Sequence, residues 1–411
     1  MPFDAASYEI LKSEAFIGGQ WVGADSGETQ DVFNPASGET IGTVPFMGAA
    51  EATRAVEAAQ AAFPSWKAMT PHERADILMA WHDLIHDYKQ ELADIMTAEC
   101  GKPLDQSLGE VVYGASFIKW FAEEGKRVYG DTIPAKQRDR RLIVTKEAAG
   151  VTSAITPWNF PNACVTRKIA PALAAGCTQV LKPAPDTPYS ATALAYLAQK
   201  AGLPDGVLNV VTGDAAPIGK VLTSHEAIRV MTFTGSTGVG KILAEQCGRH
   251  IIKASLELGG NAPFIIFDDA DVEDAVSEVI ASKFRNSGQT CVCANRILLQ
   301  DGIFDRFAEA FSARVSAMKV GHGDDQHGVD IGPLINKAGY DKVARHVDDA
   351  VSKGAKVLAG GSPHELGGNF YQPTVLSDAS KEMQLAHEET FGPVAALYRF
   401  ATEEEAIMTA N

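Results

Sequence analysis

Cysteine is scarce in this sequence, with six residues among 411. So few cysteines in so long a chain do not form the disulfide framework of a small secreted domain, and a reducing cytoplasm is the expected location. The opening stretch "MPFDAASYEILKSEAFIGGQW" has neither the apolar core of a secretory signal nor the arginines of a transit peptide, since the first arginine is Arg54. No apolar run reaches the length that crosses a membrane.

Positive charge is also in short supply. Lysine and arginine number 36 against 52 aspartate and glutamate residues, which gives a formal net charge of -16 and a sequence pI near 5.1. This charge repels phosphate backbones and anionic membranes, so we expect neither nucleic acid nor a membrane as a partner. A small anionic ligand would need a local basic pocket. Hydrophobic residues make up 45%, which is typical of a globular protein, and the length predicts more than one domain.

The first part of the chain is predicted to be helical. Amphipathic patterns indicate three helices, over residues 49–66, 70–100 and 104–126. The second has a clear start, because Thr70 and Glu73 have the spacing of a capping box and Pro71 suits the first helical position. Residues 128–146 then read as two strands with a charged tip, which predicts a hairpin that projects from the body.

From residue 151 onward, short apolar runs alternate with helical segments. This alternation predicts parallel sheets with helices on both faces, and two successive sets of it predict two α/β domains joined near residues 255–260. The first domain is expected to bind a cofactor at the carboxyl ends of its strands. The expected parts are a cofactor-binding domain of residues 1–127 and 147–256, a hairpin of residues 128–146 and a second α/β domain of residues 257–411.

Two motifs at predicted strand ends suit phosphate or ribose binding. "FTGSTGVG" runs from a strand into a helix, so Ser236 and the N–H groups after Gly235 can face a phosphate at the helix N-terminus. Its spacing is not G-x-G-x-x-G, and an ordinary glycine-rich turn explains it equally well. "LKPAPDTP" places Lys182 at the end of another strand, where it either serves a ribose hydroxyl or phosphate or is simply solvated.

Two further motifs carry groups suited to acyl chemistry. "TPWNFP" holds Asn159 on a rigid turn, where its amide either donates to an oxyanion or satisfies the turn itself. "SLELGG" places Glu257 inside an apolar strand end, where burial would raise the pKa of the carboxyl toward that of a general base. The alternative is an exposed strand residue. The two glycines that follow indicate backbone packed closely against another group.

The stretch "GQTCVCANR" contains two of the six cysteines, Cys291 and Cys293. Zinc sites usually space cysteines as C-x2-4-C with further ligands nearby, and this stretch has neither feature, so no metal is expected. A nucleophile fits better, because the N–H groups of a Gly-Gln-Thr loop after a helix can lower the pKa of a thiol and bind an oxyanion. The other four cysteines stand alone and are predicted to be buried packing residues.

Together these segments resemble the aldehyde dehydrogenase family. "PWNFP", "LKPA", "FTGST", "LELGGNAP", "GQTCVCANR" and "EETFGP" follow the family's order between Trp158 and Pro393, and the similarity extends from "FIGGQWV" to the last residue. Within the family the sequence is most similar to succinate-semialdehyde dehydrogenases, through "SKFRNSGQTC", "VTRKIAPALAAGC" and "FAEEGKRVYGDTIP". The resemblance implies a Rossmann-type cofactor domain, an α/β catalytic domain and a hairpin used for oligomerisation.

The resemblance also implies a mechanism. Cys291 would attack the aldehyde as a thiolate, and the resulting oxyanion would lie between the Asn159 amide and the Cys291 N–H. Hydride transfer to a nicotinamide would leave a thioester, which water activated by Glu257 would hydrolyse. Lys182 completes this catalytic set. An unperturbed thiol is only about a few per cent ionised at neutral pH, so Cys291 needs activation.

The cofactor residues implied by the resemblance carry over from the family's motifs. They are Trp158, Asn159, Lys182, Pro183, Ala184, Pro185, Gly235, Ser236, Leu258, Glu389 and Phe391. Many NAD-preferring members have an acid three residues after the lysine, where this chain has Pro185. Without that carboxylate a 2′-phosphate meets no repulsion beside Lys182, which favours NADP with NAD tolerated. Asp186, one residue further on, acts against this preference.

Substrate choice is expected to rest on Arg167 and Arg285, with Cys291 at the reacting end. Related enzymes place arginines at these two positions around the far carboxylate of succinate semialdehyde, and guanidinium groups can bind a carboxylate bidentately. Two surface arginines without such a role are the alternative. Glutarate semialdehyde adds one methylene, usually worth about 1–3 kcal/mol of discrimination, so it stays a candidate substrate beside other aldehydes.

The chain stops at "EEEAIMTAN", where family members continue through a segment that completes the catalytic domain, so residues 257–411 are expected to be incomplete relative to the family. The resemblance implies a homodimer or homotetramer. Two other classes stay open: a thiol hydrolase or acyl transferase that uses Cys291 without a cofactor, and an inactive, truncated binding protein. Cys293 is either a small residue packed behind the loop or the partner of Cys291 in a disulfide that switches the enzyme off.

Overall fold

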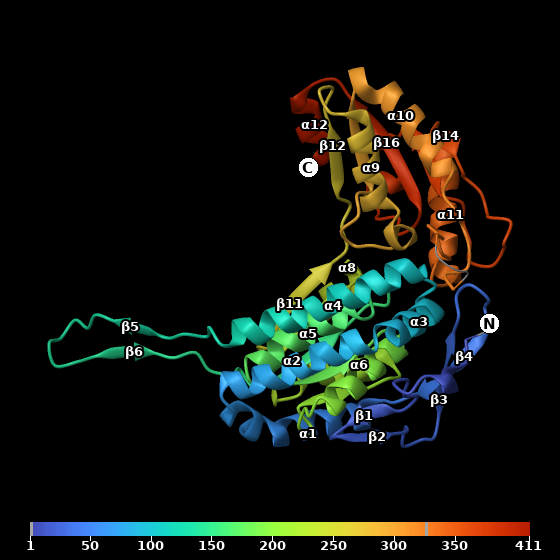
Figure 1. The fold of residues 1–411 in the computed structure, drawn as a ribbon. Helices are drawn as coiled ribbons and strands as arrows, with labels where there is room; N and C mark the ends of the chain where they lie inside the picture. The colour runs from blue at the N-terminus through green and yellow to red at the C-terminus, as the bar shows by residue number, and fades with distance from the viewer. Residues whose placement is uncertain (1–2, 325–327) are drawn as a thin grey trace. The chain divides into compact units, whose positions relative to one another are not determined.

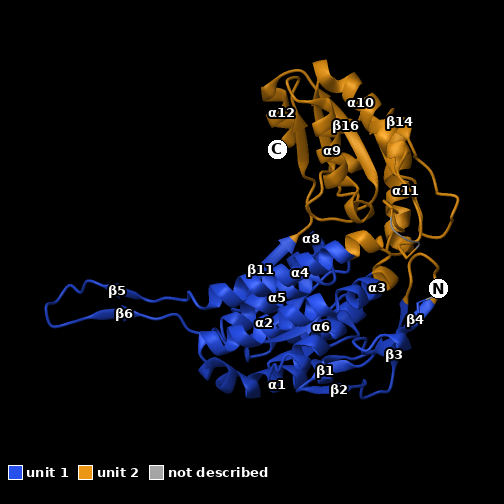
Figure 2. Cartoon of the chain, viewed as in Figure 1, with its two compact units in different colours: residues 1–32, 40–96, 108–257 blue, residues 33–39, 97–107, 258–411 orange. Residues whose placement is uncertain are grey.

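The computed structural model describes residues 3–324 and 328–411, which form two compact α/β units (Figure 1). The two units are coloured separately in Figure 2. Unit 1 comprises the chain up to Val32, Thr40–Met96 and Leu108–Glu257, and unit 2 comprises Phe33–Glu39, Thr97–Ser107 and Leu258–Asn411. Within the described ranges, no helix combines the length and apolar character that a membrane crossing requires.

A seven-stranded sheet organises unit 1, in the order β11-β10-β7-β8-β9-β1-β2. Its strands are β1 (Ala15–Ile17), β2 (Gln20–Val22), β7 (Val151–Ile155), β8 (Thr178–Lys182), β9 (Leu208–Val210), β10 (Ile228–Gly235) and β11 (Lys253–Leu258). β10, β7, β8 and β9 run parallel, whereas β1 and β2 add an antiparallel edge. The parallel sheet predicted from residue 151 onward is therefore confirmed. A separate pair, β3 (Thr29–Phe33) and β4 (Thr40–Pro45), precedes the helices.

Helices cover both faces of this sheet. On one face lie α1 (Ala49–Ala68), α7 (Ala215–Ser224) and α8 (Thr237–Arg249), and on the other lie α5 (Ala163–Ala174) and α6 (Pro188–Lys200). α2 (Pro71–Asp87) packs over α5 and α6 as an outer layer, where the Trp81 indole donates a hydrogen bond to the Leu194 carbonyl at 3.0 Å. Every residue of β8 is buried, as expected for a central strand covered on both faces.

The predicted helix over residues 70–100 is interrupted. It forms two helices, α2 and α3 (Lys89–Cys100), before α4 (Leu104–Gly125). The chain bends at Tyr88, whose ψ is 20° and whose hydroxyl accepts a hydrogen bond from Lys200 Nζ at 2.6 Å. The predicted start is confirmed, because Thr70 Oγ1 accepts from the Glu73 N–H at 3.2 Å and the Glu73 carboxylate accepts from the Thr70 N–H at 2.7 Å.

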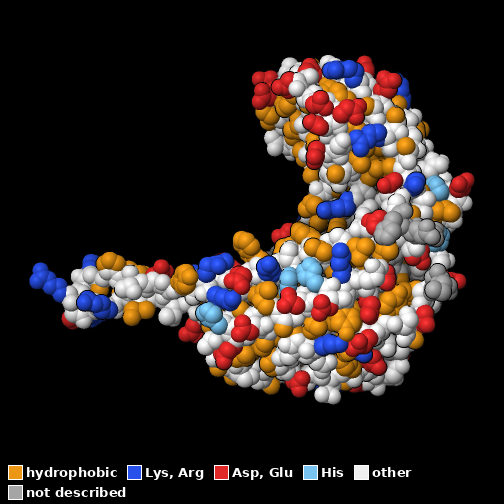
Figure 3. Space-filling view, viewed as in Figure 1, with side chains coloured by type: hydrophobic (Ala, Val, Ile, Leu, Met, Phe, Trp, Pro, Cys, Tyr) orange, Lys and Arg blue, Asp and Glu red, His pale blue; other side chains and the backbone are white. Residues whose placement is uncertain are grey.

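A hairpin lies between α4 and β7. β5 (Asp131–Ile133) pairs antiparallel with β6 (Leu142–Val144) and extends away from the rest of unit 1 (Figure 1). All six strand residues are exposed, and Ile143 is 73% exposed. Lysine and arginine side chains gather at its tip (Figure 3), where the sequence reads "KQRDRR". Because its strand residues are exposed, the hairpin has no hydrophobic core of its own, and a hairpin of this kind is only marginally stable in water.

A five-stranded sheet organises unit 2, in the order β12-β13-β16-β15-β14. Its strands are β12 (Pro263–Ile266), β13 (Arg296–Gln300), β14 (Lys356–Ala359), β15 (Thr374–Ser377) and β16 (Val394–Phe400). The first four in this order are parallel, and β14 is antiparallel to β15. The second parallel sheet that the alternating pattern predicts is thus present.

Two hydrophobic clusters cover the two faces of the unit 2 sheet. Ile297 and Leu299 of β13 belong to the cluster that contains α9 (Val272–Lys283) and α10 (Asp301–Ser316), whereas Leu298 belongs to the cluster that contains α11 (Lys337–Ser352). Successive residues of a strand point to opposite faces, so this division places α9 and α10 on one side and α11 on the other. α12 (Glu403–Ala410) follows β16.

Two segments expected in the first domain lie in unit 2 instead. Residues 33–39 and 97–107 join it through hydrogen bonds to distant parts of the chain. The Leu104 N–H donates to the Gly323 carbonyl at 3.0 Å, and the Pro35 carbonyl accepts from the Asn369 amide at 3.2 Å. These bonds span more than two hundred positions in sequence, so no local pattern announces them.

Candidate functional site

Three neighbouring strands bring most of the predicted cofactor residues to one edge of the unit 1 sheet. Ile155 of β7 lies opposite both Lys182 of β8 and Phe233 of β10 in the strand register. Parallel strands share one carboxyl edge, which is where ligands bind in open α/β sheets. The residues that end or follow these strands are Trp158 and Asn159 after β7, Pro183, Ala184 and Pro185 after β8, and Gly235 and Ser236 at β10.

Lys182 is buried at this edge, with 2% of its surface exposed. Its Nζ donates to the Pro183 carbonyl at 3.2 Å. Burial lowers the pKa of Lys182 from 10.5 to about 8, and the charges of Asp214 and Asp186 act against this shift. The interpretation of Lys182 as a solvated strand-end lysine is therefore wrong. An ammonium held out of water without a carboxylate hydrogen bond is suited to receive a phosphate or a ribose hydroxyl.

Ser236 and Asn159 occupy defined positions beside Lys182. Ser236 is the N-cap of α8, and its Oγ accepts from the Val239 N–H at 3.4 Å. The N-terminus of α8 thus begins directly after β10, where its N–H groups and dipole favour an anion. Asn159 is buried and Trp158 is half-buried in the turn after β7.

The expected burial of Glu257 is wrong. Glu257 is exposed, as are Lys253, Ala254 and Ser255 before it in β11. The reason is topological, because β11 is the edge strand of the sheet and the apolar residues beside Glu257 are only half-buried. The alternative interpretation, that Glu257 is an exposed residue of a strand, is therefore correct, and its carboxylate is accessible to water.

Lys168 is a charged residue near Glu257 that the sequence reading missed. It lies in α5 with 6% of its surface exposed, and its Nζ donates to Thr232 Oγ1 at 2.9 Å. Burial lowers the pKa of Lys168 to about 8, while the charges of Cys164 and Glu257 oppose this shift. One signal was available in the sequence: Lys168 follows Cys164 by four positions, which puts both on one face of the helix.

The backbone before Cys291 adopts an unusual conformation. Asn286, Ser287 and Gly288 have φ values of 51°, 57° and 73°, so three successive residues after α9 lie in the left-handed region. Only glycine adopts this region freely, and a Cβ at Gly288 would collide with the carbonyl oxygen of Gly392. Such strain persists only where surrounding contacts impose it.

Side-chain hydrogen bonds hold this loop on several sides. Gln289 is buried, with its amide nitrogen donating to the Asn286 carbonyl at 3.2 Å and its amide oxygen accepting from the Ile335 N–H at 2.9 Å. Ser287 Oγ donates to the Gly332 carbonyl at 2.9 Å. The Gln106 side chain accepts from the Asn286 N–H at 2.7 Å. The loop is therefore fixed in unit 2 by contacts on both sides of the strained turn.

The two cysteines of this loop have different surroundings. Cys291 is half-buried, whereas Cys293 is 1% exposed. The Cys293 thiol lies 3.7 Å from Nζ of the fully buried Lys283 and 3.6 Å from the Gly288 carbonyl oxygen. Cys293 thus packs behind the loop, as one of its two interpretations expected. Cys100, Cys164, Cys177 and Cys247 are buried, as predicted.

Glu389 offers an unsatisfied oxygen suited to a ribose hydroxyl. Its Oε1 is buried without a hydrogen-bond partner in the described part of the chain. Burial raises the pKa of Glu389, although Lys342 and Lys283 oppose the shift. A Cβ at Gly259 would collide with the Glu389 carboxylate, which identifies the group packed against the "LELGG" glycines. The Glu389 carboxylate therefore fits a hydroxyl donor such as the ribose of a nicotinamide cofactor.

The turn around Glu389 is supported from α11. His346 is buried, with Nδ1 3.2 Å from Thr390 Oγ1 and Nε2 3.3 Å from Glu388 Oε2. Burial lowers the pKa of His346, so the neutral ring is favoured. Phe391 has a φ of 56°, which is unusual for a bulky residue. Leu258, the other predicted cofactor residue of unit 2, is half-buried at the end of β11.

The two predicted substrate arginines lie in different units. Arg167 is exposed on α5 in unit 1, where Nη2 donates to the Tyr113 hydroxyl at 3.0 Å. Arg285 is exposed in unit 2, directly after Phe284, and its carbonyl accepts from Thr290 Oγ1 at 3.1 Å. Arg167 therefore lies in the helix that follows the turn after β7, and Arg285 lies at the start of the Cys291 loop.

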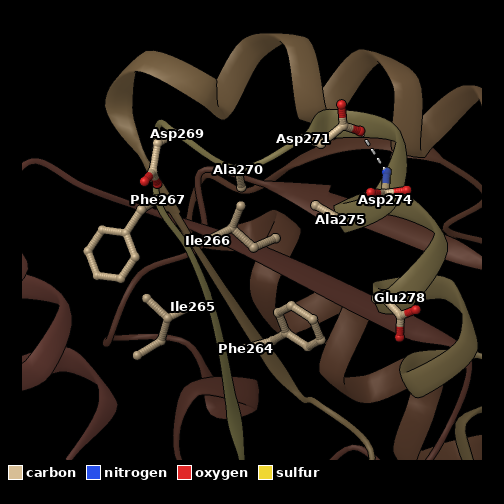
Figure 4. Close-up of a pocket in the computed structure, with 10 residues that line it drawn as sticks. All are labelled: Phe264, Ile265, Ile266, Phe267, Asp269, Ala270, Asp271, Asp274, Ala275 and Glu278. Atoms are coloured by element: carbon tan, nitrogen blue, oxygen red, sulfur yellow. Dashed lines mark hydrogen bonds between the residues drawn. The ribbon is translucent and has the colours of Figure 1, made fainter.

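A pocket at β12 is lined by other residues of unit 2. It has a volume of about 370 Å³ and is lined by Phe264 to Phe267 with Asp269, Asp271, Asp274 and Glu278 (Figure 4). Its apolar floor and acidic rim include none of the predicted site residues. Among residues 3–324 and 328–411, no group of three His, Cys, Asp or Glu side chains is arranged to hold a metal ion.

Comparison with known proteins gives strong similarity along the chain. The model of the aldehyde dehydrogenase family matches residues 21–411. A 3-sulfolactaldehyde dehydrogenase of Pseudomonas putida is 57% identical over 402 residues, covering 98% of this chain and 82% of that protein. Succinate-semialdehyde dehydrogenase [NADP(+)] of Escherichia coli is 56% identical over 402 residues, covering 98% and 83%.

Two further similarities bear on substrate and fold. A glutarate-semialdehyde dehydrogenase of Pseudomonas aeruginosa is 55% identical over 403 residues, covering 98% of this chain and 83% of that protein. The crystal structure of succinate-semialdehyde dehydrogenase from Burkholderia pseudomallei superposes with a TM-score of 0.97 at 54% identity, covering 98% of this chain and 83% of that one.

Proposed function

The chain belongs to the aldehyde dehydrogenase family, and from this premise we propose that it oxidises succinate semialdehyde to succinate with NADP. The proposal follows the activity named for relatives at 50–56% identity and the residues that this chain places at its strand ends and in the Cys291 loop. A strained loop held on both sides is the observation that carries it, because strain of this kind is typical of functional sites.

The proposed roles divide between the units. In unit 2, the Cys291 thiolate attacks the aldehyde carbon and forms a thiohemiacetal. The oxyanion is stabilised by the Cys291 N–H and by the Asn159 amide, and one such donor is typically worth about 3 kcal/mol in the transition state. When bound, the cofactor would supply a hydride acceptor, and loss of hydride from the thiohemiacetal carbon would leave a thioester on Cys291. Glu257 then takes a proton from the water that hydrolyses the thioester, a role compatible with its exposure.

NADP is the proposed cofactor, with NAD accepted. Lys182 would bind the adenosine ribose or its 2′-phosphate. The N-terminus of α8 at Ser236 would bind the diphosphate, and Glu389 would bind a ribose hydroxyl of the nicotinamide half. Pro185 leaves no carboxylate three residues after Lys182 to repel a 2′-phosphate. Asp186 is near enough to act on the Lys182 charge, which moderates the preference.

The substrate proposal rests on Arg167 and Arg285, which would bind the anionic end of the aldehyde. Guanidinium groups bind carboxylates bidentately and supply local attraction in a chain with a net charge of -16. Glutarate semialdehyde is the second candidate, favoured by the glutarate-semialdehyde dehydrogenases at 55–56% identity. A neutral aldehyde would offer the guanidinium groups no negative charge to bind.

Steady-state kinetics test the proposal directly. The protein should reduce NADP with succinate semialdehyde, and Cys291→Ala should abolish turnover. Glu257→Gln should slow the steady state while keeping the first burst of NADPH, because hydride transfer precedes hydrolysis of the thioester. Cofactor-independent ester hydrolysis with no aldehyde oxidation would instead favour a thiol hydrolase. Tight NADP binding without turnover of any aldehyde would favour a binding protein.

A homodimer or homotetramer is the proposed assembly. The β5–β6 hairpin exposes Ile133, Leu142, Ile143 and Val144, and burial of these side chains against a second copy would give the hairpin the core that it lacks. A reducing compartment is part of the proposal because the chemistry needs Cys291 as a free thiolate. We therefore propose a cytoplasmic location.

A disulfide between Cys291 and Cys293, formed when peroxide takes up the two electrons of the two thiols and is reduced to water, stays a proposal. A disulfide between residues two positions apart would require the loop to rearrange, because Cys293 packs inward against Lys283. Peroxide should then inactivate the enzyme, and a thiol reductant should restore it. Identical inactivation of Cys293→Ala would show that Cys291 is oxidised without its neighbour.

A further inference from the structure

Two aromatic side chains of α4 hold the guanidinium of Arg167. Its Nη2 donates to the Tyr113 hydroxyl at 3.0 Å, and its Cζ lies 4.7 Å from the ring centroid of Phe117 and 5.6 Å from that of Tyr113. The two rings meet edge to face, with centroids 4.9 Å apart. An exposed arginine is normally mobile, so these contacts remove much of the rotamer freedom that binding an anion would otherwise cost.

One face of α4 is arranged against α5. Glu110, Tyr113, Gly114 and Phe117 follow the i, i+3, i+4, i+7 spacing that places residues on one side of a helix. The Glu110 carboxylate is buried and accepts from the Asn162 N–H at 3.0 Å and the Ala163 N–H at 3.1 Å. It therefore satisfies the first N–H groups of α5 and fixes that helix start to α4.

The two helices also approach closely at Gly114. A Cβ at this position would lie 3.3 Å from Thr166 Oγ1 and 3.5 Å from the Ala163 backbone. A larger residue would push α5 away, and Arg167 lies one helical turn beyond Ala163. α4 thus contacts α5 at three successive points: the helix start, the close approach at Gly114 and the two rings beside Arg167. Together these contacts fix the position of Arg167.

We infer that Tyr113 is a specificity-determining positioning residue that acts through Arg167 on the anionic end of the substrate. Arg167 forms its hydrogen bond to Tyr113 and no ion pair with any carboxylate in the described ranges, so its other N–H groups point to no protein anion. Phe117 covers one face of the guanidinium, which reduces its hydration and strengthens its attraction for an oxyanion. This inference rests on the proposed function, because it assigns how that substrate site selects a terminal carboxylate or sulfonate.

The test compares two aldehydes of the same length, succinate semialdehyde and butanal. Tyr113→Phe keeps the ring and removes the hydroxyl, so KM for succinate semialdehyde should rise roughly ten-fold, as for a lost hydrogen bond to a charged group. The kcat for succinate semialdehyde and both constants for butanal should stay at their wild-type values. Phe117→Leu should raise the same KM roughly three-fold through loss of the cation–π contact. Tyr129→Phe, on an exposed tyrosine elsewhere in unit 1, is the matched control and should change nothing.

A double-mutant cycle then asks whether Tyr113 acts through Arg167. Arg167→Met alone should raise KM for succinate semialdehyde, and adding Tyr113→Phe to it should produce no further change. Additive effects would overturn the inference, because Tyr113 would then contact the substrate itself. Equal losses on both aldehydes would overturn it as well. If wild-type protein showed no preference for the acidic aldehyde, the proposed function would be wrong. If that preference existed but was unaffected by Tyr113→Phe and Phe117→Leu, only the inference about Tyr113 would be wrong.

Discussion

At the scale of single residues, two lysines of unit 1 are buried without a carboxylate hydrogen bond. Lys182 and Lys168 each have a pKa lowered from 10.5 to about 8, and burial is the main cause for both. A lysine with a lowered pKa is charged below that value and loses its charge as pH rises through it. Any ligand that requires the ammonium is therefore bound best below pH 8.

This titration predicts how cofactor affinity depends on pH. If Lys182 receives the ribose 2′-phosphate, NADP affinity should be level below pH 8 and fall by up to about ten-fold per pH unit above it, because binding then requires uptake of a proton. Fluorescence titration of the free enzyme on either side of pH 8 measures this. Lys182→Met should bind NADP weakly at every pH, and Lys168→Met should keep the dependence. A wild-type affinity that does not change with pH would contradict the assigned role of Lys182.

The sequence predicted the chemistry-bearing residue types better than their surroundings. Lys182, Ser236 and Asn159 were placed correctly at strand ends because a strand that leads into a turn is a local pattern. Burial is a different matter, since it depends on which elements cover a residue. Glu257 was expected to be buried and is exposed on an edge strand, and Lys168 was overlooked although α5 buries it.

At the scale of elements, the turn between α9 and Cys291 should be intolerant of change. Gly288→Ala puts a side chain at a φ of 73° and against the Gly392 carbonyl, so the loop must shift. A displacement near 1 Å at a reacting group typically costs about 100-fold in rate, and local strain costs about 1–3 kcal/mol. We expect kcat/KM to fall at least that far while the protein still folds, as thermal unfolding and circular dichroism would establish.

Gly109→Ala is the control for this substitution. Gly109 lies inside α4, has nothing within 4 Å of a new Cβ, and does not have a positive φ. Alanine there should raise the free energy of unfolding by up to about 1 kcal/mol through its higher helix propensity. A Gly288→Ala enzyme with wild-type activity would show that the strained turn has no part in positioning Cys291.

Element boundaries were predictable where a local signal marks them. The capping box at Thr70 fixes the start of α2, and the ends of α1 and α4 fall within two residues of the predicted ones. The end of α2 at Tyr88 was missed because no cap signal marks it in the sequence, and the side chain there contacts Lys200, more than a hundred positions away. Left-handed Asn286 and Ser287 were missed for a similar reason, since only tertiary hydrogen bonds favour that conformation there.

At the scale of the whole molecule, the hairpin should govern assembly. Ile143→Asp places a charge at a side chain that is 73% exposed in the isolated chain, and burial of that charge against a second copy would be costly. Light scattering after size-exclusion chromatography should show a smaller particle than for wild type. Met408→Asp, at an equally exposed residue of α12, serves as the control and should leave the mass unchanged. Equal masses for all three proteins would argue against assembly through the hairpin.

The architecture was largely predictable, and the membership of the units was not. Alternating strand and helix patterns determine two parallel sheets covered on both faces, because a parallel connection needs a crossover helix. Residues 33–39 and 97–107 belong to unit 2 through bonds to Gly323, Asn369 and other distant groups. Such partnerships depend on the folded chain and leave no trace in a window of neighbouring residues.

The close approach of Gly288 to the Gly392 carbonyl has a consequence for protein engineering. The loop that carries Cys291 and the turn that carries Glu389 meet at this contact, so the backbone conformation of each one restricts that of the other. A chimera that imports one loop from a relative with a different path would clash unless the second loop came with it. In a recombination experiment, residues 284–296 and 387–393 should therefore always be taken from the same parent protein.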